Sequence, residues 1–228
     1  MVRLGQDMKA YKYFHSRYRT SISMGLYYVN TFDNIRTRYE NGLISDPTEG
    51  VVKNLSGDLL IGNSSDPKYQ KTIRDLDQLR AIRIEGDCSN IFISNNSFKN
   101  HVRNSHMFCV TTERNDSYWQ NLPTTQGGPY DSCLEIFDFV EFSRRLAHAL
   151  ATRYAVFGNL MVNKCFFEAN SGTIADGTTK LPSYFRKPEA DDFKKQFEAR
   201  AVLVPYQAQA LVPRTFYLNV SDLVSLVG

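Results

Sequence analysis

The chain has 228 residues, of which 42% are hydrophobic and 22% are charged, a balance that excludes an intrinsically disordered protein and fits one large or two small globular domains. The formal net charge of +3 is too small to require a polyanionic partner, although nucleic acid stays possible as a substrate. The basic residues are dispersed along the chain and form no nucleic-acid-binding arm.

Cysteine usage and the N-terminus indicate a cytoplasmic protein. The four cysteines are widely separated, and no Cys or His spacing is typical of a metal site, so we expect reduced thiols and no bound metal. Residues 1–18 contain no apolar signal segment, and no stretch approaches the ~20 apolar residues of a membrane span. We therefore expect no membrane partner.

The first half of the chain predicts short elements separated by turn residues. Gly25 divides a helix from an aromatic strand, and the Asp-Pro and Gly of residues 46–50 indicate a tight turn. Ser56-Gly57 then divides two short strands of a hairpin, and residues 62–105 are predicted as short strands and loops. The expected strands lie at residues 26–29, 51–55, 58–61, 81–85 and 91–94.

The second half contains the strongest helix signal, at residues 139–154, where apolar residues recur at helical spacing. A polar loop is expected at 171–179, and 189–197 begin like a helix with acidic residues in the first turn. The remaining strands are expected at residues 106–112, 133–137, 154–167, 202–205 and 215–220. Without a repeat, linker or composition break, the sequence predicts a single α+β domain over residues 1–228.

The most informative segment is the change from helix to strand around Gln196-Phe197-Glu198. If Phe197 begins the strand and turns inward, the period of two sends Gln196 and Glu198 together to the other face. An amide and a carboxylate placed side by side can bind sugar hydroxyls and stabilise a developing positive charge. The pair is therefore a candidate for chemistry at a ribosyl bond.

Three polar groups at strand ends resemble, in order and spacing, the ADP-ribosyltransferase superfamily. In that superfamily an early strand supplies an Arg or His, a central strand supplies hydroxyl residues, and a late strand supplies a catalytic Glu, in many toxins within Gln-x-Glu. Here these groups are Lys12, Tyr13 and His15 in the early segment, Thr111 and Thr112 in the middle, and Gln196 and Glu198 at the end.

The chain also resembles an uncharacterised bacterial family found in abortive-infection and phage-defence settings. The likeness is spread over nearly the whole sequence. Its motifs here are Tyr11-Lys12-Tyr13, Gly25-Leu26-Tyr27-Tyr28, Asp46-Pro47-Thr48-Glu49, Val110-Thr111-Thr112 and Glu198-Ala199-Arg200.

The resemblance implies a mixed or antiparallel split sheet with flanking helices, and transfer of ADP-ribose from NAD to an intracellular protein or nucleic acid. Glu198 would bond a nicotinamide-ribose hydroxyl and stabilise the oxocarbenium-like transition state, and Gln196 would orient the acceptor. Thr111 and Thr112 would support the NAD pocket. Lys12 or His15, beside Tyr13, would contact the pyrophosphate or the adenosine ribose. The role would be that of a toxin or defence effector, with an antitoxin or phage protein as a further partner.

The early site departs from the superfamily pattern. Its Arg is replaced by Lys12, or by Arg17 or Arg19, and a Lys cannot give the bidentate contact to phosphate that Arg gives. Two other functions therefore remain open. The chain could be a non-catalytic module that uses the same fold to bind a partner, or an NAD glycohydrolase with water as the acceptor.

Overall fold

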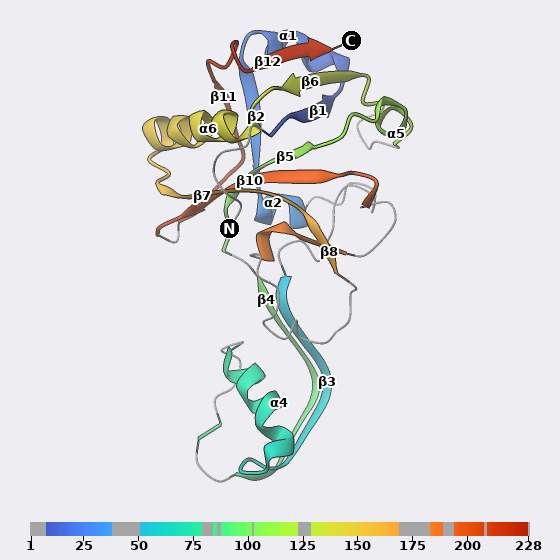
Figure 1. The fold of residues 1–228 in the computed structure, drawn as a ribbon. Coiled ribbons are helices and arrows are strands. Elements are labelled where there is room, and N and C mark those ends of the chain that lie inside the picture. The colour runs from blue at the N-terminus through green and yellow to red at the C-terminus, as the bar shows by residue number, and fades with distance from the viewer. Residues whose placement is uncertain are drawn as a thin grey trace. The chain divides into compact units, whose positions relative to one another are not determined.

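The computed structural model describes residues 8–37, 51–78, 84–85, 88–101, 103–122, 129–168, 183–188, 194–207 and 209–227 (Figure 1). The turn predicted at 46–50, the loop at 171–179, most of the strand at 81–85 and the start of the helix at 189–197 lie outside these residues. The chain divides into two compact units. The first comprises Met1–Glu49, Arg103–Ala169 and Tyr184–Gly228, and the second comprises Gly50–Val102 and Asn170–Ser183.

The first unit is built on an eight-stranded sheet in which every recorded strand pair is antiparallel. Its path runs β11-β2-β5-β1-β6-β12, and β10 joins β5 on one side and β7 on the other. With few helices beside this sheet, the α+β class predicted from the sequence is confirmed. The strands are β1 (Ala10–Phe14), β2 (Leu26–Thr31), β5 (His106–Thr111), β6 (Ser132–Ile136), β7 (Gly158–Lys164), β10 (Glu198–Pro205), β11 (Arg214–Tyr217) and β12 (Val224–Val227).

Strand β5 is central, and its two edges are paired differently. Strand β10 follows β5 over its whole length, from Leu203 opposite His106 to Glu198 opposite Thr111. On the other edge β2 pairs with the start of β5, and β1 pairs with it only at Thr111. Among the described strands, none is therefore recorded as a partner of the middle of β5 on that edge.

Helix α6 (Phe139–Tyr154) covers the apolar core of this unit, and its bounds confirm the prediction of a helix at 139–154. Asp138 caps the N-terminus, since its side chain accepts hydrogen bonds from the backbone N–H groups of Val140 and Glu141. Ala155 ends the helix in the left-handed conformation, with φ of 52°. The buried side of α6 packs on the sheet residues Phe108, Val110, Leu134, Ala201 and Leu203, among others.

Short helices connect the strands of the first unit. Helix α1 (Arg19–Ser23) ends just before Gly25, whose φ of +82° favours glycine, so the predicted change from helix to strand at this residue is confirmed. The strand expected at 154–167 starts only at Gly158, because α6 extends to Tyr154, and it is interrupted at Cys165 between β7 and the following strand. The remaining elements are η1 (Ser16–Tyr18), α2 (Phe32–Thr37), α5 (Asp116–Gln120), η2 (Ser183–Phe185) and the parallel pair β8 (Phe166–Glu168) and β9 (Arg186–Pro188).

In its described residues, the second unit contains two long strands and one helix. Strand β3 (Val51–Asn63) runs through Gly57 without turning and pairs with β4 (Ser89–His101), so the hairpin predicted at 51–61 is wrong. Gly57 instead marks an irregularity in the register of this pair. Helix α4 (Pro67–Gln78) lies in a region predicted as strands and loops. Figure 1 shows β3 and β4 as a long two-stranded ribbon.

Candidate functional site

The early, central and late segments singled out in the sequence meet in the sheet. Thr111 on β5 lies opposite Tyr11 on β1 and opposite Glu198 on β10. Directly opposed residues of antiparallel strands project to the same face, so Tyr11, Thr111 and Glu198 form one row across three adjacent strands. The sheet therefore places a hydroxyl beside the predicted carboxylate.

The next residues on this face continue the site along β5 and β10. Two positions beyond the row, Cys109 lies opposite Arg200. The alternate residues Val110 and Ala199 point to the other face and belong to the apolar core under α6. The face that carries Glu198 is consequently the side of the sheet away from α6.

Glu198 is held by two cations. Its Oε2 forms an ion pair with Lys187 Nζ at 2.5 Å, and its Oε1 accepts a hydrogen bond from Arg200 Nε at 2.5 Å. All three side chains are withdrawn from solvent, since the exposed fractions are 8% for Glu198, 3% for Lys187 and 0% for Arg200. Arg200 also donates from Nη1 to the carbonyl oxygen of Tyr184 at 2.7 Å, which ties β10 to the η2 turn.

The charges of this cluster decide the protonation state of Glu198. Burial raises the pKa of its carboxyl, but the charges and hydrogen bonds of Arg200 and Lys187 outweigh burial and hold the pKa well below its usual range. The thiol of Cys109 responds in the opposite sense, because burial and the nearby Glu198 charge raise its pKa to about 12. Glu198 is therefore an anion at neutral pH, and Cys109 is a neutral thiol.

Gln196 joins the same cluster, although not in the way the sequence predicted. Strand β10 begins at Glu198, and Phe197 precedes it in a left-handed conformation with φ of 44° and 40% of its surface exposed. The expectation that Phe197 starts the strand and turns inward is wrong. This reversal of the chain nevertheless leaves Gln196 and Glu198 both buried, and Gln196 Oε1 accepts a hydrogen bond from Lys187 Nζ at 3.3 Å.

The two threonines fix backbone segments close to Glu198. Thr112 donates to the carbonyl oxygen of Phe197 through its backbone N–H at 2.9 Å and through its hydroxyl at 3.2 Å. Thr111 donates from its hydroxyl to the carbonyl oxygen of Glu113. Thr112 thus fixes the backbone next to Glu198, whereas Thr111 fixes the turn that follows β5.

Lys12 lies on the other face of the sheet. It follows Tyr11 in β1, so its side chain points toward the core, where its Nζ lies 5.2 Å from the centre of the Phe108 ring. The ammonium donates to the carbonyl oxygen of Cys109 at 2.7 Å, in the middle of β5 where no strand partner is recorded on that edge. Burial lowers the pKa of Lys12. Its position fits support of the sheet better than contact with a phosphate.

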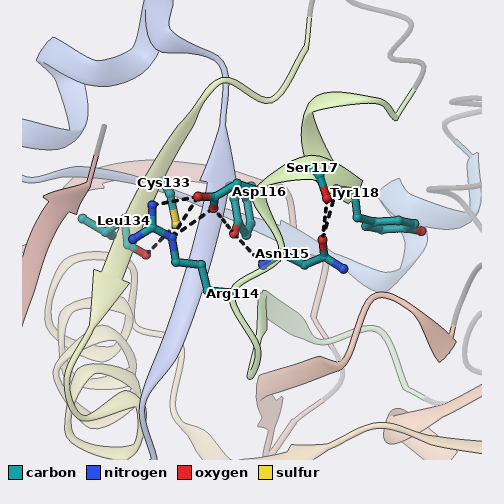
Figure 2. Close-up of polar contacts among 8 residues, drawn as sticks. Arg114, Asn115, Asp116, Ser117, Tyr118, Cys133 and Leu134 are labelled. Carbon is teal, nitrogen blue, oxygen red and sulfur yellow. Dashed lines mark hydrogen bonds and ion pairs between the residues drawn. The ribbon is translucent and has the colours of Figure 1, made fainter.

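Tyr13 and His15 belong to a second cluster at the end of β1. The Tyr13 hydroxyl donates to Asp116 at 2.6 Å, and its ring stacks on Trp119 at 5.3 Å. His15 donates from Nδ1 to the carbonyl oxygen of Pro129. Figure 2 shows that Asp116, the first residue of α5, is also held by Arg114 in the segment just before this helix. The structure therefore does not bring Tyr13 or His15 into contact with Glu198.

The sequence did not identify the cations that hold Glu198. Arg200 appeared only as part of the Glu-x-Arg resemblance, and Lys187 was not singled out. The sequence did contain a local indication that Arg200 lies near Glu198, because the period of two places both residues on the same face of a strand. It contained no such indication for Lys187, which reaches the site from β9 only through tertiary packing.

Among the described residues, no three His, Cys, Asp or Glu side chains gather closely enough to hold a metal ion. None of the helices in the described part combines the length and apolar character that a membrane crossing requires. No protein-family model, curated protein or solved structure matches the chain.

Proposed function

We propose that the chain is an NAD-dependent ADP-ribosyltransferase in which Glu198 is the catalytic carboxylate. The observation that carries the proposal is the single row formed by Tyr11, Thr111 and Glu198 on three adjacent strands. The resemblance named an early, a central and a late strand, which are far apart in the sequence. Their adjacency in the sheet is what a shared site requires.

The state of Glu198 suits the proposed role. An ionised carboxylate offers about four lone-pair positions, and its contacts with Lys187 and Arg200 use only part of them. One remaining position accepts a hydroxyl of the nicotinamide ribose. The fixed negative charge then favours the oxocarbenium-like transition state over the ground state, because positive charge grows on the sugar only as its bond breaks.

The proposed reaction transfers ADP-ribose from NAD to a protein or nucleic acid in the same cell. The bond between nicotinamide and the ribose C1′ breaks, and neutral nicotinamide leaves with the bonding electrons. The acceptor atom bonds to C1′ and releases its proton to solvent. Gln196 orients the acceptor, because an amide can hydrogen-bond but cannot act as a general base. The assignment to a toxin or defence effector, with an antitoxin or phage protein as partner, is supported by the sequence resemblance alone.

The NAD pocket in this proposal lies on the face of the sheet away from α6. Thr112 supports it through the backbone next to Glu198, and Thr111 supports it through the turn that follows β5. Tyr13 and His15 lie at the end of β1 and are assigned to the adenosine side of NAD. We assign Lys12 a structural role in the sheet instead, because its ammonium donates a hydrogen bond to the carbonyl oxygen of Cys109.

The test compares two isosteric variants, Glu198→Gln and Glu135→Gln, in an assay with NAD labelled in its adenylate half, with and without cell lysate. Glu135 lies opposite Tyr11 on β6 and is paired with Lys9, so it is a matched carboxylate on the same face of the sheet. We expect Glu198→Gln to slow label transfer about 100- to 1000-fold, as removal of a transition-state contact does. Glu135→Gln should retain transfer. Thermal unfolding of both variants checks that they fold.

The outcomes separate the candidate functions. Transfer that survives in Glu198→Gln as well as it does in Glu135→Gln contradicts the catalytic role of Glu198. Nicotinamide release without label transfer, lost in Glu198→Gln, identifies an NAD glycohydrolase instead.

A non-catalytic binding module on the same fold is the second candidate. One observation favours it: the Glu198 carboxylate is buried and lies between two cations, an arrangement that also occurs as a purely structural network. In that case neither transfer nor nicotinamide release is detected in the wild type, and Glu198→Gln changes only the stability of the protein.

A further inference from the structure

We infer that a groove on the outer side of α6 binds single-stranded nucleic acid. The groove has a volume of about 510 Å³ and lies between α6 and the residues at the end of β11 and just beyond it. Its polar lining comes mainly from Arg144, Arg145, His148 and Arg153 of α6 and from Tyr217 and Asn219. This site is separate from the Glu198 cluster, so the inference does not rest on the proposed function.

The charge of the groove is positive and extended. Three arginines and one histidine line it, against one acidic residue, Glu141, which pairs with Arg144 at 3.5 Å and with Arg145 at 3.2 Å. Arg144 and Arg153, both exposed, are nine residues apart on α6, which corresponds to about 13 Å along the helix axis and to opposite sides of the helix. They therefore flank the groove at two separated points, where they can contact two different phosphates of one strand.

Contacts of Arg145 within the protein hold one wall of the groove in place. Arg145 forms a bidentate pair with Asp222, with Nη1 at 2.7 Å from Oδ1 and Nη2 at 2.8 Å from Oδ2. Its Nη1 also donates to the carbonyl oxygen of Asn219 at 3.3 Å. Arg145 thereby fastens the segment after β11 to α6. The positions of Asn219 and its neighbours are set by this clamp.

Tyr217 supplies an aromatic surface at the groove. Its ring lies directly on Gly25, because a Cβ atom placed on Gly25 would meet Tyr217 Cε2 at 2.9 Å. Despite this support, 49% of Tyr217 remains exposed. An aromatic ring that is fixed on one side and open on the other is a platform for a nucleobase.

The combination of features favours a single strand. Small ligands are usually enclosed on most sides, whereas this groove is open to solvent along α6. In a duplex the bases are stacked inside and cannot reach a protein ring, while a single strand offers both its phosphates and its base faces. An acidic peptide would use the arginines but gain nothing specific from Tyr217.

The experiment measures binding of a fluorescein-labelled oligothymidylate by fluorescence anisotropy over a series of salt concentrations. The groove variant is Arg144→Gln/Arg153→Gln, and the matched control is Lys71→Gln/Arg74→Gln, which removes two exposed charges from α4. We expect the groove variant to bind at least about ten-fold more weakly, with the salt slope reduced by about two. The control should bind like the wild type.

The variant Tyr217→Leu tests the platform separately. It should weaken binding about 5- to 150-fold without changing the salt slope, because stacking is lost but no charge is removed. A wild type that does not bind at low salt would overturn the inference. Equal losses of affinity in the groove and α4 variants would also overturn it. A third contrary result would be that polyglutamate competes as well as the oligonucleotide and that Tyr217→Leu binds like the wild type. None of these variants alters the Glu198 cluster, so the NAD assay fails or succeeds independently.

Discussion

Arg200 is the residue that fixes the position of Glu198 most directly. It is fully buried and uses two different nitrogens, Nε toward Glu198 and Nη1 toward the carbonyl oxygen of Tyr184. A lysine at this position carries the same charge but has only one nitrogen, so it cannot make both contacts in the same geometry. The guanidinium fork is therefore as important here as the charge.

We predict that Arg200→Lys lowers the free energy of unfolding by about 1–3 kcal/mol, because one buried acceptor loses its partner. Urea denaturation at neutral pH measures the change. The control is Arg114→Lys, which alters an exposed pair with Asp116, with side chains 41% and 40% exposed. The denaturation midpoint of the control should move far less, since exposed pairs contribute little. Equal shifts in the two variants would contradict a special role for the buried cluster.

His106 makes the stability of the protein dependent on pH. It is buried at the start of β5, where Nε2 donates to the carbonyl oxygen of Val212 at 3.1 Å and Nδ1 has no hydrogen-bond partner among the described residues. Burial lowers the pKa of the imidazole, and the charge of Arg214 adds to the effect, against the opposing bond to Val212. The folded state consequently keeps His106 neutral at a pH where the unfolded chain takes up a proton.

The sign of the effect follows from this difference. Because the folded pKa lies below the unfolded value of about 6.5, stability is full above pH 6.5 and is lost as the pH falls below it, by up to about 1.4 kcal/mol per unit. We predict a smaller loss in His106→Gln, whose amide can donate to Val212 but does not titrate. Urea midpoints at neutral pH and in mild acid test this, and parallel losses in the two proteins would assign the acid sensitivity to other groups.

Part of the candidate site could be predicted from the sequence. The order of Thr111 and Glu198 along the chain, with the strand signals at 106–112 and 202–205, predicted that these two residues share one sheet, whereas Gln196 lies just before the strand. The register that puts Thr111 opposite Glu198, and the approach of Lys187 from β9, depend on long-range packing. Local patterns contain no information about either.

At the scale of elements, predictions succeeded where a local signal and tertiary packing agree. Helix α6 combines an apolar period with the Asp138 cap and buries its apolar side, so its bounds follow from the sequence. Around Gly57 the prediction from the sequence was wrong. Its Ser-Gly pair predicts a turn, but the pairing of β3 with β4 extends the strand through it.

The end of α6 offers a test of backbone strain. Ala155 has a left-handed conformation, which costs an L-residue about 1–2 kcal/mol but costs glycine almost nothing. We predict that Ala155→Gly raises the free energy of unfolding by up to about 1 kcal/mol, after allowance for the greater freedom of glycine in the unfolded chain. Chemical denaturation measures the gain.

The same substitution in the middle of the helix should have the opposite sign. Ala151 lies within α6, where a glycine destabilises by about 0.5–1 kcal/mol. Ala151→Gly is thus a matched control for Ala155→Gly. If both variants lose stability, the left-handed conformation at residue 155 does not determine where the helix ends.

For the whole molecule, the division into two units leads to a prediction about folding. The apolar core of the first unit is drawn entirely from residues outside 50–102. The ribbon of β3 and β4 also leaves and returns at neighbouring points, because Val51 and His101 are register partners. Their Cα atoms are therefore only about 5 Å apart, a gap that a short linker can bridge.

We predict that replacing residues 51–101 by a short Gly-Ser linker leaves a protein that still unfolds cooperatively, near the midpoint of the full chain. The physical reason is that the eight-stranded sheet, the α6 core and the Glu198 cluster lose none of their described members. Circular dichroism during thermal unfolding measures the transition. A variant without a cooperative transition would instead show that residues 1–228 depend on one another as the single domain that the sequence predicts. In that case we expect Arg200→Lys to destabilise the whole chain in one step.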